Sequence, residues 1–467
     1  MAGKRRNLAR ACGLTERLGT AVLLYAVFGL FYLGVPIAAR RIGEPLEPRW
    51  GAGAVVCASL VMLLYLAAGP RAAAGLWGMA FLLALLNAGL FVESAAGRLP
   101  ILSVVGSALS WLVLGMWWGN AAAVVGLMPS LILLIGLTLV MLGGHAWAHA
   151  ETVRHGGSRD EGLGFPTTAS LGLVGHGFLF YVFLNPEWST PPWPGLGALL
   201  VMTLASSTTA LFVKRAVLHA GATTAAAVIV MVWAQDRSLG EEWSWSWVEF
   251  VVGEAVIAYS LIWLWITRRL EGVASSVCAL ATLFIGELTL MAVAAPFPEF
   301  MVVSVMLNAP QFAVLTLLHV VNLSLILWLS WQRRWQWVGL GAVLVAWLAT
   351  DMWQEGFGIV APPWTQTLVL VTSLYAVFAV YPFVLGSRAR ESRDPYITAI
   401  GGSVFYFFAA RMALLQGGLS SIVGIVPVFE GIVLALLLRA LLRIEPQGGR
   451  DLARLAIVAG PPAQFQR

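Results

Sequence analysis

Charged residues and cysteines are scarce in this chain of 467 residues. Only 11% of the residues are Asp, Glu, Lys or Arg, whereas 59% are hydrophobic. Soluble globular domains have about 25% charged and about 45–50% apolar residues. The composition therefore excludes an ordinary soluble domain and indicates an integral membrane protein.

The three cysteines, Cys12, Cys57 and Cys278, are isolated from one another and form no CxxC pair. They predict neither a disulfide framework nor a zinc site. His145 and His149 share one helix face, but a metal site needs further ligands at matching positions. No P-loop, GxGxxG or HExxH motif occurs in a suitable context, so we expect no cofactor and no metal, and an ATP-driven pump is disfavoured.

Apolar stretches of about 18–25 residues follow one another along the chain, and each is long enough to cross a bilayer. They predict an all-α, polytopic transmembrane helix bundle of about fifteen helices, with fourteen to sixteen compatible with the pattern. The expected spans are 18–38, 51–69, 73–92, 99–118, 121–144, 167–184, 195–213, 216–234, 247–267, 273–295, 311–331, 336–353, 365–386, 395–413 and 418–441.

The charges in the connections alternate from residue 166 onward. One side holds pairs such as Lys214 and Arg215, and the other side holds mainly acids. By the positive-inside rule the basic side and the C-terminus are cytoplasmic. Residues 1–17 and 40–49 are both basic although one span separates them, so the orientation of the N-terminus stays open.

The net charge of +5 comes from these connections and from no polar domain. The expected partner is therefore membrane lipid, and no nucleic acid is expected. Lys occurs only at Lys4 and Lys214, and Ala and Gly are abundant, which is typical of a GC-rich bacterial genome. The predicted location is the bacterial inner (cytoplasmic) membrane.

Three regions are predicted: a basic N-terminal tail (1–17), a multi-span domain (18–442) and a cytoplasmic, partly disordered tail rich in Gly, Pro and Arg (443–467). The phrase LYAVF occurs at 24–28 and again at 374–378, and a basic loop follows each copy. This indicates repeat units near 18–69 and 365–413, and internal repeats are common in transporter folds.

Several phrases carry a family resemblance: LLYAVFGLFYLGVPIAARR, HGFLFYVFLNPEW, LLHVVNLSLILWLSWQRRWQW and SLYAVFAVYPFVLG followed by GIVPVFEGIVLALLLRALLR. They resemble a family of large bacterial polytopic membrane proteins of unknown function. Longer members of that family carry an N-terminal coiled coil, and this chain resembles only their later membrane portion. The resemblance implies fold and location and no catalytic residues.

Two acids lie inside expected spans. Glu254 (VVGEAVIAYS) and Glu287 (FIGELTLMAV) each follow a Gly and stand about 10–12 Å below the outer surface of consecutive helices. A charged side chain at this depth faces the bundle interior or water. Two carboxylates in one low-dielectric site do not both ionise readily, so the pair predicts proton or cation binding. Alternatively, each acid is protonated and hydrogen-bonded to a neighbour such as Tyr259.

Three other intramembrane groups have two interpretations each. Glu430 follows Pro427 in the last span, and it either joins the acidic pair or holds the bundle together. His176 and His319, the latter with Asn322 near it in sequence, either relay protons or pack with one satisfied hydrogen bond.

The outer side is rich in aromatic and acidic residues, which is typical of an interfacial aromatic belt. The alternative is a rim that binds a glycan by stacking on indoles and bonding to carboxylates, with an Arg for phosphate. The residues that would form this rim are Glu187, Trp188, Trp245, Asp351, Trp353 and Arg411.

Three functions are compatible with these features. The leading hypothesis is transport or export of an envelope-related small molecule or lipid-linked sugar, coupled to protons at Glu254 and Glu287. The second is a membrane enzyme acting on a lipid-linked glycan, with Asp351, Glu187 or Glu242 as the acid. The absence of a sizeable outer loop domain from the sequence counts against the enzyme. The third is a non-catalytic membrane scaffold.

Overall fold

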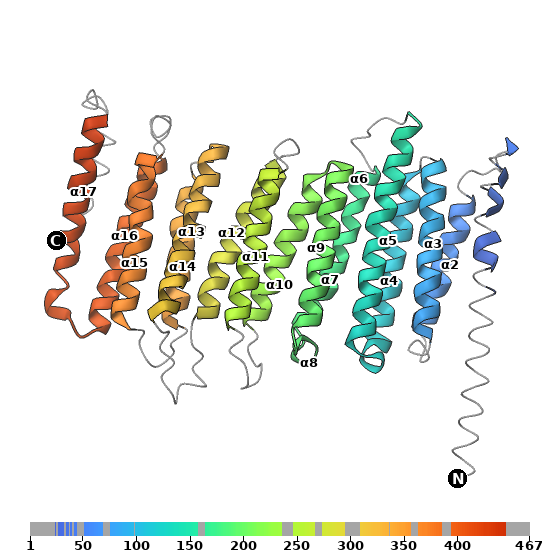
Figure 1. Cartoon of the computed structure of the whole chain (residues 1–467), viewed down its shortest axis with the longest axis horizontal. Helices are drawn as coiled ribbons and strands as arrows, with labels where there is room; N and C mark the ends of the chain where they lie inside the picture. The colour runs from blue at the N-terminus through green and yellow to red at the C-terminus, as the bar shows by residue number, and fades with distance from the viewer. Residues whose placement is uncertain are drawn as a thin grey trace, which may run out of the picture. The chain divides into compact units, whose positions relative to one another are not determined.

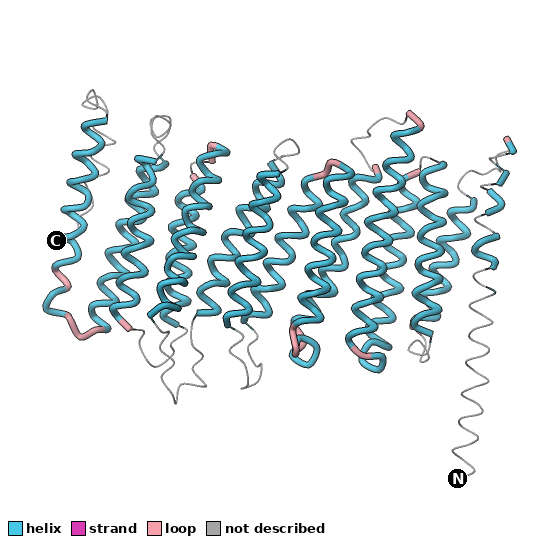
Figure 2. The backbone as a smooth tube through the Cα atoms, in the orientation of Figure 1, coloured by secondary structure: helices cyan, strands magenta, loops and turns pink. Residues whose placement is uncertain are grey.

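The fold was analysed in a computed structural model. It describes residues 51–68, 75–97, 99–156, 164–235, 246–266, 273–294, 309–335, 337–355, 363–384 and 394–444, and scattered residues between 24 and 43. Within these ranges every regular element is a helix and no strand occurs, as Figure 2 shows. The predicted all-α fold is therefore confirmed for the described part of the chain.

The chain divides into two compact units. The first comprises residues 1–229 and 266–275, and the second comprises 230–265 and 276–467. The helices of the first unit are α2 (Gly51–Ala67), α3 (Leu76–Gly97), α4 (Pro100–Val125), α5 (Leu127–Arg154), α6 (Phe165–Thr168), η2 (Ala169–Leu173), α7 (Val174–Phe183), α8 (Pro186–Ser189), α9 (Trp193–Val213) and most of α10 (Ala216–Gln235) (Figure 1).

The second unit contains the remaining helices, apart from the last residue of α11 and the first three of α12. They are α11 (Ser246–Ile266), α12 (Val273–Ala294), α13 (Ala309–Arg333), α14 (Val338–Glu355), α15 (Trp364–Val384), α16 (Asp394–Gln416), η6 (Ser420–Ile422) and α17 (Ile425–Ile444). Together these helices place all of the intramembrane acids that the sequence singled out within one unit.

Among the described residues, ten helices are long and apolar enough to cross a membrane. Shorter apolar helices add to them at Gly53–Ala67, Val251–Ile262 and Val338–Gln354. Large apolar side chains such as Leu200 and Leu344 are about 60% exposed, which suits contact with lipid tails. The chain is thus a multi-pass membrane protein, and the described residues leave the count of about fifteen spans and the repeat as predictions.

Small residues let helices approach closely in the first unit. A Cβ at Gly106 of α4 would collide with Leu90 of α3, and one at Gly144 of α5 would collide with Phe91. Membrane helices have little hydrophobic driving force for association, so such close packing supplies much of their attraction. This contact fixes α3, α4 and α5 as the core of the unit.

The second unit follows the same rule. Gly402 of α16 lies against Phe378 of α15, and Gly339 of α14 lies against Thr398 of α16. Around these contacts α13 packs against both α14 and α15. The resulting core holds α13 in the place from which its polar side chains reach α11 and α12.

One predicted boundary is wrong. We expected spans at 99–118 and 121–144, but α4 continues to Val125 and α5 continues to Arg154. The break falls at Gly126, whose φ of 94° is readily adopted only by glycine. Pro129 lies in the first turn of α5, where its missing N–H costs nothing.

The expected span 167–184 also differs. It consists of α6, the 3-10 helix η2 and α7 instead of one continuous helix. Residues 1–17 and 445–467 lie outside the described residues, as does part of the first LYAVF copy. They include the predicted N-terminal tail and all but the first two residues of the predicted C-terminal tail, which end α17.

Candidate proton-binding site

Glu254 and Glu287 lie at matching depth on two helices of the second unit. Glu254 is eight residues after the first residue of α11, and Glu287 is seven residues before the last residue of α12. At 1.5 Å per residue both are about 10–12 Å from those helix ends. The two acids therefore lie at similar distances from these helix ends.

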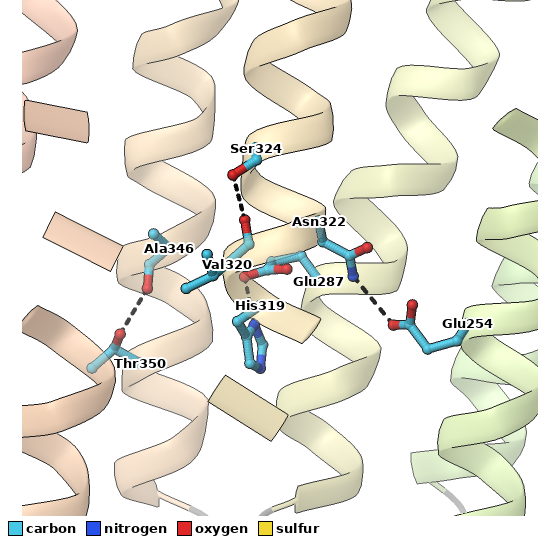
Figure 3. Close-up of polar contacts among 8 residues, drawn as sticks. All are labelled: Glu254, Glu287, His319, Val320, Asn322, Ser324, Ala346 and Thr350. Atoms are coloured by element: carbon cyan, nitrogen blue, oxygen red, sulfur yellow. Dashed lines mark hydrogen bonds and ion pairs between the residues drawn. The ribbon is translucent and has the colours of Figure 1, made fainter. Parts of the chain in front are cut away.

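A third helix, α13, connects the two acids (Figure 3). His319 Nδ1 and Glu287 Oε1 are 2.5 Å apart, and the Asn322 amide donates to Glu254 Oε1 at 3.3 Å. His319 and Asn322 are three residues apart and so lie on neighbouring positions of one helix face. The two carboxylates are thus linked through α13, in the order Glu254, Asn322, His319 and Glu287.

These four residues form what we call the acid–amide–imidazole chain. Glu287, His319 and Asn322 have no exposed surface, whereas Glu254 is half-buried. Charged side chains within a membrane are expensive and mark ion or proton pathways. The burial gradient from Glu254 to Glu287 gives the chain an accessible end and an enclosed end.

Three atoms of the chain have unused hydrogen-bonding capacity. Glu287 Oε2, His319 Nε2 and Asn322 Oδ1 are buried and have no hydrogen-bond partner among the described residues. More than about 90% of buried polar groups in proteins do have a partner. These three atoms therefore depart from the usual pattern of buried polar groups.

The pair at the enclosed end joins an imidazole to a carboxyl group. A neutral imidazole has one nitrogen that donates and one that accepts, and a carboxylate only accepts. The short contact between His319 Nδ1 and Glu287 Oε1 therefore has a proton between the two atoms.

The glycines before the two acids have different surroundings. A glycine in a membrane helix can let a neighbouring helix approach closely. A Cβ on Gly286 would collide with Ile257 of α11, whereas a Cβ on Gly253 would meet nothing within 4 Å. Only Gly286 is therefore needed for α11 and α12 to pack together beside the site.

Glu430 lies apart from this chain. It is buried at 6% exposure on α17, within electrostatic range of Tyr375 and Tyr406. The structure therefore brings Glu254 and Glu287 together with His319 and Asn322, and it places Glu430 in another cluster.

The proposed outer rim is divided. In the first unit Glu187 is exposed in α8, and Trp188 packs against Trp118 and Tyr181, with ring centroids 5.7 and 6.0 Å apart. In the second unit Asp351 and Arg411 are exposed. The residues of the two units are not shown to share a site.

Of two further rim residues, one is buried and the other lies outside the described residues. Trp353 has no exposed surface, and its Nε1 donates to Thr367 at 3.3 Å, so its ring belongs to the core. Trp245 lies outside the described residues, as does Glu242. The glycan rim stays a hypothesis.

The other buried histidines bond to hydroxyl groups. His176 Nε2 is 3.4 Å from Thr203 Oγ1, and His145 contacts Thr168 and Ser107. In the described part of the chain, no group of three or more His, Cys, Asp or Glu side chains is arranged to hold a metal ion.

Two features of the acids escaped the sequence interpretation. Glu93 is buried at 2% exposure in α3, and it was overlooked because the expected span ended at residue 92. The contacts of Asn322 and His319 to the acids were also missed. Their i,i+3 spacing on one face of an apolar helix was the available signal.

No known protein family matches this sequence, and no curated protein and no solved structure is significantly similar to it.

Proposed function

We propose that this protein is a proton-coupled transporter of the bacterial inner membrane that moves an envelope-related small molecule or a lipid-linked sugar. The acid–amide–imidazole chain is the observation that carries the proposal. It combines two intramembrane carboxylates with an imidazole, the side chain best suited to proton exchange near neutral pH.

Coupling would depend on α13. This helix supplies both His319 and Asn322, so a shift of α13 alters the contacts of Glu287 and Glu254 together. A proton can drive movement only if it binds one conformation better than another. Neutralising the His319–Glu287 pair would favour the conformation in which that pair is enclosed.

The finer architecture belongs to the same proposal. The ten long spans and the shorter apolar helices support a total near fifteen, with the C-terminus in the cytoplasm. Repeat units near 18–69 and 365–413, and membership of the uncharacterised bacterial family, also remain proposals. The repeat and the family membership both rest on the sequence phrases quoted above.

A reconstituted system tests the proposed function. Full-length protein in liposomes loaded with a pH-sensitive dye would be exposed to polyprenyl-phosphate-linked sugars as probe substrates. We expect proton movement upon substrate addition, and at least about a tenfold loss in a Glu254→Gln, Glu287→Gln double variant because neither amide can bind the coupling proton.

The matched control is Glu151→Gln, which removes a carboxylate at the polar end of α5, 30% exposed and paired with Arg154. Its proton movement should equal that of the unmodified protein. Equal activity in the double variant would contradict coupling at these acids. Absence of proton movement with every probe would contradict the assignment as a transporter of this class.

The membrane enzyme is a second candidate, favoured by the exposure of Asp351 and Arg411 on helices α14 and α16, which pack together. It predicts turnover of a lipid-linked glycan that is lost in Asp351→Asn. The transporter proposal predicts no turnover and an unchanged phenotype for this variant.

A further inference from the structure

Glu430 faces a different environment from the other two acids. It lies on α17 near Tyr375 of α15 and Tyr406 of α16, whose rings stack with centroids 4.6 Å apart and planes 16° apart. Ser403 donates to the Tyr375 hydroxyl at 3.3 Å. We call these four residues the Glu430 cluster.

The carboxyl group of Glu430 has no hydrogen-bond or ion-pair partner among the described residues. The residue is only 6% exposed. Arg411 of the adjoining α16 and Arg439 of α17 itself are exposed. A buried membrane carboxylate needs a proton or a cation for compensation.

A narrow apolar groove runs between the same three helices. Ala379 of α15, Ile400 of α16, and Leu434 and Leu437 of α17 line it, and it is open along one side. Apolar walls with a few convergent polar groups are typical of small-molecule sites. The groove alone would accept any apolar chain, so its selectivity must come from its end.

Three residues of the Glu430 cluster lie about one helical turn from residues that line the groove. Tyr375 precedes Ala379 by four residues, Glu430 precedes Leu434 by four, and Ser403 follows Ile400 by three. Each step is about one helical turn, or about 5.4 Å, along the same helix face. All three helices therefore place a polar residue one turn beyond the groove.

We propose that the groove and the Glu430 cluster together bind a hydrophobic organic cation with a linear alkyl chain. The chain lies along the groove, and the ammonium group lies against the Glu430 carboxylate and the tyrosine rings. Aromatic faces attract cations, and most strongly where water is excluded. The narrow groove favours a chain over a bulky ring system. This site is independent of the acid–amide–imidazole chain and does not rest on the proposed function.

Equilibrium binding of radiolabelled decyltrimethylammonium tests the proposal. The full-length protein would be held in nanodiscs, with binding to empty nanodiscs subtracted and the probe kept below its micelle concentration. We expect saturable binding that is weakened at least about tenfold by Glu430→Gln. Tyr406→Phe, which retains the ring, should change affinity by less than about threefold, and Tyr406→Leu should weaken it about tenfold.

Two controls distinguish binding at this site from nonspecific hydrophobic partitioning and from the effects of misfolding. Decanoate has the same chain and the opposite charge, and it should show no saturable binding. Ala399→Phe fills the groove and should abolish binding, whereas Ala435→Phe adds the same ring on the exposed side of α17 and should not.

Several results would overturn the proposal. These are non-saturable binding to the unmodified protein, equal binding of decanoate, or unchanged affinity in Ala399→Phe or in a folded Glu430→Gln. If Glu430→Gln fails to fold, Ala399→Phe and decanoate still decide the question. Loss of proton coupling in the Glu254 and Glu287 variants would leave this binding intact.

Discussion

His145 in the first unit and His319 in the second are both fully buried in membrane-spanning helices, yet their neighbours differ. His145 Nδ1 is 2.8 Å from Thr168 Oγ1 and its Nε2 is 3.3 Å from Ser107 Oγ. His319 contacts the Glu287 carboxyl through Nδ1, and its Nε2 has no partner among the described residues. The first ring contacts neutral hydroxyl groups, and the second contacts an acid.

The buried asparagines repeat this contrast. Asn87 Nδ2 donates to the Leu83 carbonyl at 2.7 Å and to Ser110 Oγ at 2.8 Å, and its Oδ1 lies 3.1 Å from the same hydroxyl. Asn322 donates to Glu254, and its Oδ1 has no partner among the described residues. Neutral polar pairs thus fix the packing of the first unit, whereas the second unit places amide and imidazole groups beside acids.

The largest stability effect should come from the histidines. His319→Ala removes the hydrogen-bond partner of a fully buried acid, which costs about 1–3 kcal/mol for a neutral group and more for a charged one. His145→Ala removes one partner from the Ser107 and Thr168 hydroxyls, the second of which still donates to the Phe165 carbonyl, and should cost about 1–3 kcal/mol. Unfolding in mixed detergent micelles measures both. Equal losses would show that the two histidines play the same structural role.

Substitution of the two buried asparagines should affect stability and proton movement differently. Asn87→Leu leaves the Ser110 hydroxyl with only its bond to the Gly106 carbonyl and should cost about 1–3 kcal/mol, with proton movement retained. Asn322→Leu frees the half-buried Glu254, so stability should change by less than about 1.5 kcal/mol while proton movement falls. Both variants would be assayed by unfolding and in liposomes. A reversal of this pattern would remove Asn322 from the chain.

The two glycines test how closely α11 and α12 pack beside the site. Gly286→Ala forces Ile257 to shift, and such overpacking costs about 1–3 kcal/mol. Gly253→Ala has open space and should stabilise the helix by up to about 1 kcal/mol. The same unfolding assay compares them. A tolerated Gly286→Ala would place α11 and α12 further apart than the structure does.

The smallest change in stability should come from replacing a charged residue outside the expected spans. Arg154 is 76% exposed, and it pairs with Glu151 at 3.5 Å. Exposed pairs contribute about 0–1 kcal/mol, so Arg154→Gln should leave stability nearly unchanged. A loss comparable to that of His145→Ala would show that this helix end is anchored more strongly than its exposure indicates.

Much of the helical fold could be predicted because polar connecting segments flank most apolar runs. The expected span 273–295 corresponds to α12 at Val273–Ala294. The join between α4 and α5 was misplaced because residues 99–144 are apolar throughout and contain several glycines. Only the backbone shows that Gly126, with its positive φ, is the one that ends the helix.

The site was predicted in part. Counting residues placed Glu254 and Glu287 at one depth, since depth follows from helix rise alone. Their partners depend on which face α13 turns towards α11 and α12, and contacts 32 and 68 residues apart in sequence are not encoded in local periodicity. For the same reason the sequence could not separate Glu430 from the pair.

The most direct test of the central claim is infrared spectroscopy of the reconstituted protein during a pH titration. A protonated carboxyl group has a carbonyl stretch that a carboxylate lacks. We predict a band that changes with pH in the unmodified protein and in Glu151→Gln, and that is lost or markedly reduced in the Glu254→Gln, Glu287→Gln double variant. An identical pH-dependent band in the folded double variant would contradict proton binding by the chain.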